Sequence, residues 1–98
     1  MAAKKLFIVA RYTKDGLRKN VEVSVPFRVG THPLPQIEPF NVRVDVVPGV
    51  WHGFTEIKIT EEGKLWFPGC GPSYLRDGKA MFEIRAHGVE YHFDFRVE

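Results

Sequence analysis

The sequence predicts an all-β fold: a single antiparallel β-sandwich of six to seven strands with immunoglobulin-like architecture. Apolar and polar residues alternate with a period of two in several segments, which places the apolar side chains of each strand on one face. Nine glycines and seven prolines interrupt these segments at short intervals, as turns between strands require. The 98 residues suffice for one hydrophobic core and are too few for two, so residues 1–98 are expected to form one domain.

The first predicted hairpin pairs residues 6–13 with residues 21–29 across a basic loop around Lys14, Asp15 and Gly16. Valines alternate with polar residues in the second of these segments, which is typical of a strand with one buried face. Pro26 lies within it and lacks the N–H that a ladder needs. The second strand is therefore predicted to lie at a sheet edge or to bend.

The middle of the chain predicts a stiff crossover followed by a strand. Residues 31–40 contain three prolines, which restrict the backbone to extended conformations. Val42, Val44 and Val46 then alternate with Arg43 and Asp45 as in a one-sided strand. Because this strand contains no proline, it is predicted to be an open edge that accepts a partner strand.

A second hairpin is predicted from residues 57–60, a turn through residues 61–63, and a return over residues 64–67. In this register Ile59 meets Leu65, and Ile57 meets Phe67. Trp66 then lies on the surface across from Lys58. Residues 68–74 are expected to form an irregular loop before the last hairpin.

The last hairpin has the most specific pattern. If His87 and Gly88 form a two-residue turn, Ile84 pairs with Tyr91 and Glu83 pairs with His92. The same register places apolar pairs on one face and charge-complementary pairs on the other. Two packed antiparallel sheets commonly bury strands of this kind, and a small OB-like β-barrel is the alternative.

The sequence contains no recognisable catalytic or metal-binding motif, so the protein is predicted not to be an enzyme and to need no cofactor or metal. Cys70 with His52 is the best nucleophile pair available, but their proximity does not follow from the sequence. A lone cysteine favours a reducing, cytoplasmic location. The sequence has no apolar run of roughly 20 residues, so no membrane contact is expected.

The preferred functional hypothesis is a protein-binding or assembly module that contacts another protein or a second copy of itself. Small β-domains without a recognisable motif also occur as structural or host-inhibitor subunits of viruses and phages. By analogy with these proteins, such a role is a further possibility for this one. Trp51 lies between two glycines, where its side chain is available to a partner. The predicted protein-binding residues are Trp51, His52, Val44, Val46 and Trp66.

The alternative hypothesis is a single-stranded nucleic-acid-binding domain. Cations cluster in the predicted N-terminal hairpin, with Phe7 and Tyr12 nearby for base stacking. The overall pI of about 8.8 is slightly lower than that typical of a basic nucleic-acid footprint. The residues that would bind the backbone are Lys5, Arg11, Lys14, Arg18 and Lys19.

Overall fold

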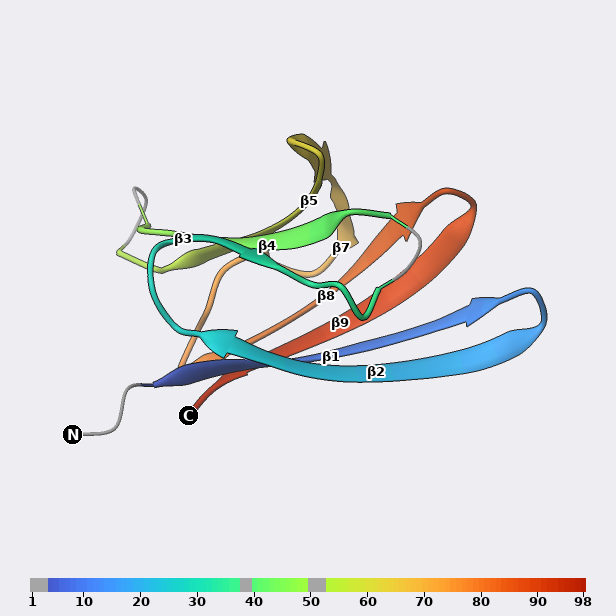
Figure 1. The fold of residues 1–98 in the computed structure, drawn as a ribbon. Helices are drawn as coiled ribbons and strands as arrows, with labels where there is room; N and C mark the ends of the chain where they lie inside the picture. The colour runs from blue at the N-terminus through green and yellow to red at the C-terminus, as the bar shows by residue number, and fades with distance from the viewer. Residues whose placement is uncertain (1–3, 38–39, 50–52) are drawn as a thin grey trace.

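The computed structural model describes residues 4–37, 40–49 and 53–98, which form nine strands in two antiparallel sheets (Figure 1). One sheet has the order β2-β1-β9-β8-β7 and the other has the order β3-β4-β5-β6. The strands are β1 (Lys5–Lys14), β2 (Leu17–Pro26), β3 (Gly30–Pro33), β4 (Val42–Val47), β5 (Glu56–Glu61), β6 (Lys64–Trp66), β7 (Pro68–Cys70), β8 (Lys79–Ala86) and β9 (Val89–Val97).

The all-β class and the two antiparallel sheets are confirmed, but the strand number of six to seven is too low. Two segments that were predicted to be irregular contain short strands. β3 lies in the proline-rich segment and pairs with β4, while β7 follows Phe67 and pairs with β8. Leu34, just after β3, is fully buried, so this segment contributes to the core as well as connecting strands.

Two long hairpins, β1–β2 and β8–β9, form most of the five-stranded sheet (Figure 1). The predicted register of the last hairpin is confirmed from Phe82↔Phe93 to Ala86↔Val89. In the first hairpin, the turn consists of Asp15 and Gly16 alone, with φ of 51° and 77°. Because this turn is so short, β2 begins earlier than predicted, at Leu17, and it ends at Pro26.

The predicted register of the hairpin β5–β6 is wrong by one residue. Ile59 lies opposite Trp66, and Thr60 lies opposite Leu65. The turn has two residues, Glu62 and Gly63, with φ of 49° and 83°, instead of the predicted three. A one-residue shift moves each side chain to the other face, so Trp66 lies in the core, 6% exposed, and not on the surface.

The predicted open edge at residues 42–47 is also wrong. β4 lies between β3 and β5, so both of its sides are hydrogen-bonded. Val44 and Val46 are 0% and 3% exposed and belong to the core. The valine alternation thus reflects one buried face and does not by itself place the strand at an edge of the sheet.

Aromatic side chains from the five-stranded sheet form much of the core. Tyr91, Phe93 and Phe95 follow one another along the inner face of β9, with adjacent ring centroids 5.9 Å apart. Phe82 of β8 lies beside this row, 5.0 Å from the ring of Phe95. Burial raises the pKa of Tyr91, because it disfavours the charged phenolate.

Phe93→Ala should destabilise the protein by about 3–5 kcal/mol, because it removes a fully buried ring from the centre of the core. Phe67→Ala is the matched control, since Phe67 is 76% exposed and its removal should change stability by less than about 0.5 kcal/mol. Urea unfolding of both variants measures the difference. Equal losses would contradict the observed placement of the two rings.

Candidate functional site

The outer face of the five-stranded sheet carries side chains from four long strands in register. Alternate residues of β1 point away from the core, among them Phe7, Val9 and Arg11. Arg11 lies between Asn20 of β2 and His92 of β9. Residues from both ends of the chain are therefore neighbours on this face.

The tips of the two long hairpins extend together past the four-stranded sheet, as Figure 1 shows. Near these tips the outer face is hollowed into a groove of about 740 Å³. Its walls are contributed by β1, β2, β8 and β9 and by the turn between the last two. The lining residues are Arg11, Tyr12, Thr13, Arg18, Lys19, Asn20, Arg85, Gly88, Val89, Glu90 and His92.

The groove, called the basic groove below, is lined by more cations than anions. Its lining residues carry four positive charges, on Arg11, Arg18, Lys19 and Arg85, and one negative charge, on Glu90, a formal +3 with His92 neutral. Lys19 lies opposite Tyr12 and therefore extends from the inner-facing row of β2. The whole chain carries a formal charge of +2, so the rest of the molecule is slightly acidic. A concave surface with one sign of charge attracts ligands of the opposite sign and accelerates their association.

Away from the tips, the same face becomes less polar. A second groove of about 610 Å³ is lined in part by Phe7, Val9, Tyr74 and Met81. Met81 is 66% exposed, and the guanidinium of Arg96 covers the ring of Phe7 at 5.5 Å. Apolar contact is therefore available beside the charged groups.

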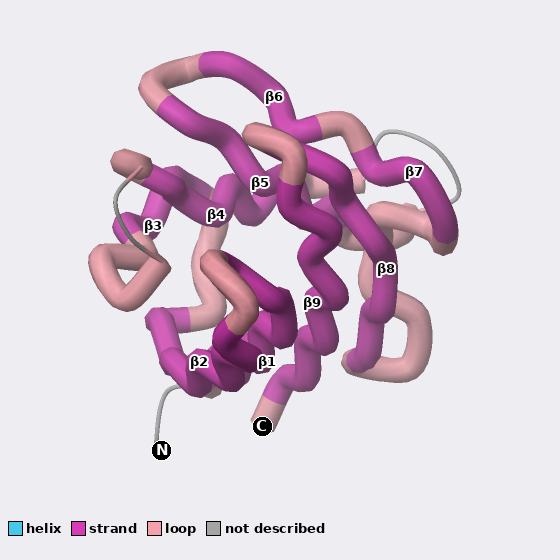
Figure 2. The backbone as a smooth tube through the Cα atoms, turned by 90° about the vertical axis from the view of Figure 1, so that its right-hand side faces the viewer, coloured by secondary structure: helices cyan, strands magenta, loops and turns pink. Residues whose placement is uncertain are grey.

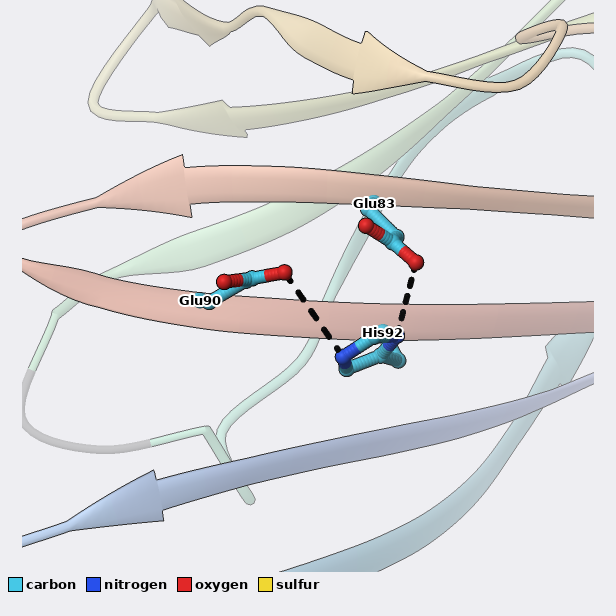
Figure 3. Close-up of side chains that lie close together, drawn as sticks. All are labelled: Glu83, Glu90 and His92. Atoms are coloured by element: carbon cyan, nitrogen blue, oxygen red, sulfur yellow. Dashed lines mark ion pairs between the residues drawn. The ribbon is translucent and has the colours of Figure 1, made fainter.

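His92 lies between two carboxylates on this face, as Figure 3 shows. Its Nδ1 is 3.2 Å from Glu83 Oε1, and its Nε2 is 3.9 Å from Glu90 Oε1. The predicted pairing of His92 with Glu83 is thus confirmed. Each carboxylate faces a different ring nitrogen, and the two nitrogens point away from each other. Both ring nitrogens of His92 therefore face a carboxylate. To bind one metal ion, the two carboxylates would have to turn toward the same ring nitrogen.

Ion pairs also hold side chains next to His92 on the outer face. Arg11 forms an ion pair with Asp94, which lies on the adjacent strand β9. Arg11 is thereby held at the floor of the basic groove. Arg85 lies opposite Glu90 in the β8–β9 register.

The predicted nucleic-acid-binding cations are only partly brought together. Arg11, Arg18 and Lys19 line the basic groove, whereas Lys5 lies at the far end of β1. The ammonium of Lys14 lies 6.0 Å from the centre of the Phe40 ring and is not among the groove residues. Arg85 was missed, because finding it required the pairing of β1 with β9.

The predicted protein-binding residues do not form one surface. Val44, Val46 and Trp66 lie in the core, as described above. Trp51 and His52 lie outside the described residues. Cys70 is exposed on β7, where a short, irregular strand gives it little cover, in contrast to the usual burial of a single cysteine.

A polar contact joins the two sheets on the core side of the hairpin tips. Glu61 Oε1, at the end of β5, accepts a hydrogen bond from Trp66 Nε1–H at 3.0 Å and lies 2.6 Å from His87 Nε2. Phe40 stacks on the His87 ring with centroids 3.7 Å apart. The hydrogen bond with His87, and then that with Trp66, lowers the pKa of Glu61.

No family model, curated protein or solved structure matches this chain. Within the described ranges, no helix is long and apolar enough to cross a membrane.

Glu61→Gln should lower the melting temperature at neutral pH and have less effect in acid. A carboxylate with a lowered pKa in the folded state stabilises the protein above its ordinary pKa of 4.5, and this contribution is lost as the pH falls through the lower, folded value. Thermal melts of the protein and the variant from neutral pH to strong acid measure the difference. A gap in melting temperature that stayed constant, or widened in acid, would contradict the Glu61 contact.

Proposed function

We propose that the protein is a non-catalytic protein-binding module that holds an acidic segment of a partner protein in the basic groove. The formal +3 of the groove in a chain of net +2 is the observation that carries this proposal. Complementary charge across an interface sets the partner and the rate of encounter more than it sets affinity. The second groove on the same face can bind apolar residues of the partner next to its acidic segment, which adds the apolar burial that charge pairing alone does not give.

The remainder of the face favours a protein over a nucleic acid. The carboxylates of Glu22, Glu83 and Asp94 lie on the outer face of β2, β8 and β9. They alternate with cations such as Arg96 on this face, so a polymer with a negative charge on every unit fits the face less well than a protein whose acidic residues form one short segment. Tyr12, the aromatic residue that lines the groove, is 8% exposed, so its ring offers little surface for base stacking.

Single-stranded nucleic acid remains the second candidate. It is favoured by one observation: three of the five cations of the predicted nucleic-acid site line the same groove, and Arg85 adds a fourth cation. Neutralising phosphates releases counterions, so such binding would weaken steeply with salt.

We also propose a cytoplasmic setting, which the unpaired Cys70 supports. An assembly role, such as that of a viral or phage structural or host-inhibitor subunit, is compatible with a docking surface of this kind.

A fluorescein-labelled peptide of alternating Glu and Gly should bind to the protein, and Arg85→Glu should weaken this binding by about tenfold. The substitution reverses one charge in the groove wall, and a like charge in place of an opposite one costs on the order of 1 kcal/mol or more. Fluorescence anisotropy at low salt measures both affinities.

Lys64→Glu is the matched control, because it makes the same charge change at an exposed residue of β6, in the other sheet. It should leave the affinity within about twofold, a difference well under 1 kcal/mol. An oligothymidylate of equal charge, labelled in the same way, tests the second candidate. Tighter binding of the oligonucleotide with a steep salt dependence would replace the protein proposal by the nucleic-acid one.

A further inference from the structure

The free side of β2 is the open edge of the five-stranded sheet. β2 spans ten residues and is the outermost strand, and none of the described strands pairs with it on the side away from β1. β7, at the opposite edge of the sheet, spans three residues. Long unpaired edges are templates for pairing with another strand.

The hydrogen-bond pattern identifies which backbone groups are free. The Phe27 N–H donates to the Lys4 carbonyl at 3.1 Å, and in an antiparallel ladder every second pair exchanges such bonds. The odd-numbered residues of β2, such as Val21 and Val23, therefore direct their N–H and C=O groups toward β1. Those of Arg18, Asn20, Glu22 and Ser24 point outward.

Pro26 fits this pattern. It is even-numbered, so the N–H that it lacks would point away from β1 and the ladder loses nothing. The prediction from Pro26 that the second strand lies at an edge is thereby confirmed. Pro26 also limits the open edge to the part of β2 that precedes it.

We infer that β2 pairs antiparallel with β2 of a second copy of this chain, with the twofold axis at Asn20. The side chains of Arg18 and Glu22 are exposed and both lie on the outer face. In this register, Arg18 of each copy lies opposite Glu22 of the other in an isologous interface. In the same register, the outward N–H and C=O groups of Arg18 in one copy form hydrogen bonds with those of Glu22 in the other.

Other registers are less favourable. An axis at Glu22 brings two Glu22 carboxylates together, and an axis at Arg18 brings two Arg18 guanidiniums together. An axis at Val21 places Arg18 opposite Ser24, which forms no ion pair. An acidic peptide added to this edge would satisfy Arg18 but face Glu22, whereas a second copy satisfies both charges.

This pairing joins two five-stranded sheets edge to edge and leaves both outer faces on the same side. Each copy then presents its basic groove on one continuous surface. A partner with two acidic segments would bind such a surface more tightly than it binds one copy. The dimer itself does not depend on the proposed function of the groove.

The test is sedimentation velocity of the purified chain over about a hundredfold range of concentration, with a charge exchange at the edge. The unchanged protein should shift from monomer to dimer as its concentration rises. Glu22→Arg, and separately Arg18→Glu, should raise the dimer dissociation constant by about tenfold or more, because each places like charges opposite each other at both ends of the interface. The double variant R18E/E22R should return to within about threefold of the original constant, a difference below roughly 1 kcal/mol.

Asn20→Pro tests the backbone contact, since it removes an outward N–H and leaves the β1 ladder intact. It should abolish the dimer while the monomer keeps a cooperative melt. Arg85→Glu is the control, because it weakens binding of the acidic peptide and should leave the dimer unchanged. This separates a failure of the groove proposal from a failure of the dimer.

A protein that stays monomeric at every concentration would overturn the inference. A double variant as impaired as its single variants, or a dimer insensitive to Asn20→Pro, would overturn the Asn20-centred register.

Discussion

The antiparallel pairing of β1 with β9 is the contact on which the rest of the structure depends. Each of these strands belongs to a hairpin that its own turn specifies, and their pairing from Leu6↔Val97 to Arg11↔His92 joins the two hairpins into one sheet. Reciprocal hydrogen bonds between Lys5 and Glu98 continue this ladder to the end of the chain. In Figure 2, the joined strands form a curved layer opposite β3–β6. The same pairing places the row of core aromatics on one face and the basic groove on the other.

The two faces of the sheet follow from a single register, so the core and the candidate binding surface are physically coupled. A strand cannot shift by one residue to change its surface without also moving its apolar side chains out of the core. The burial of Ile8, Phe93 and Phe82 thus fixes where Arg11, His92 and Glu83 lie on the outside. The core therefore holds the exposed charges in one arrangement, although the charges themselves contribute little to stability.

Local chemistry predicted that three hairpins form and gave the register of the last one, but it gave the wrong register for β5–β6 and did not show which strands pair between hairpins. The His87–Gly88 turn and the alternation on either side determine the last hairpin pair for pair, because turn and burial agree. In the β5–β6 hairpin two turn lengths were compatible with the apolar pattern, and burial of the large Trp66 side chain accompanies the shorter one. The valines of β4 alternate whether the strand is central or at an edge. Arg85 could be joined to the N-terminal cations only by knowing that β1 and β9 are neighbours.

Amide hydrogen exchange followed by NMR, at a concentration where the protein is monomeric, tests the β1–β9 pairing most directly. Each hairpin could form without the other, and the N–H groups that β1 directs toward β9 would then be open to water. The β1–β9 pairing predicts strong protection for the amides of Val9 and Arg11, close to that of the whole fold, and fast exchange for Asn20 and Glu22 on the free edge of β2. Exchange at Val9 and Arg11 as fast as at Asn20 and Glu22 would contradict it.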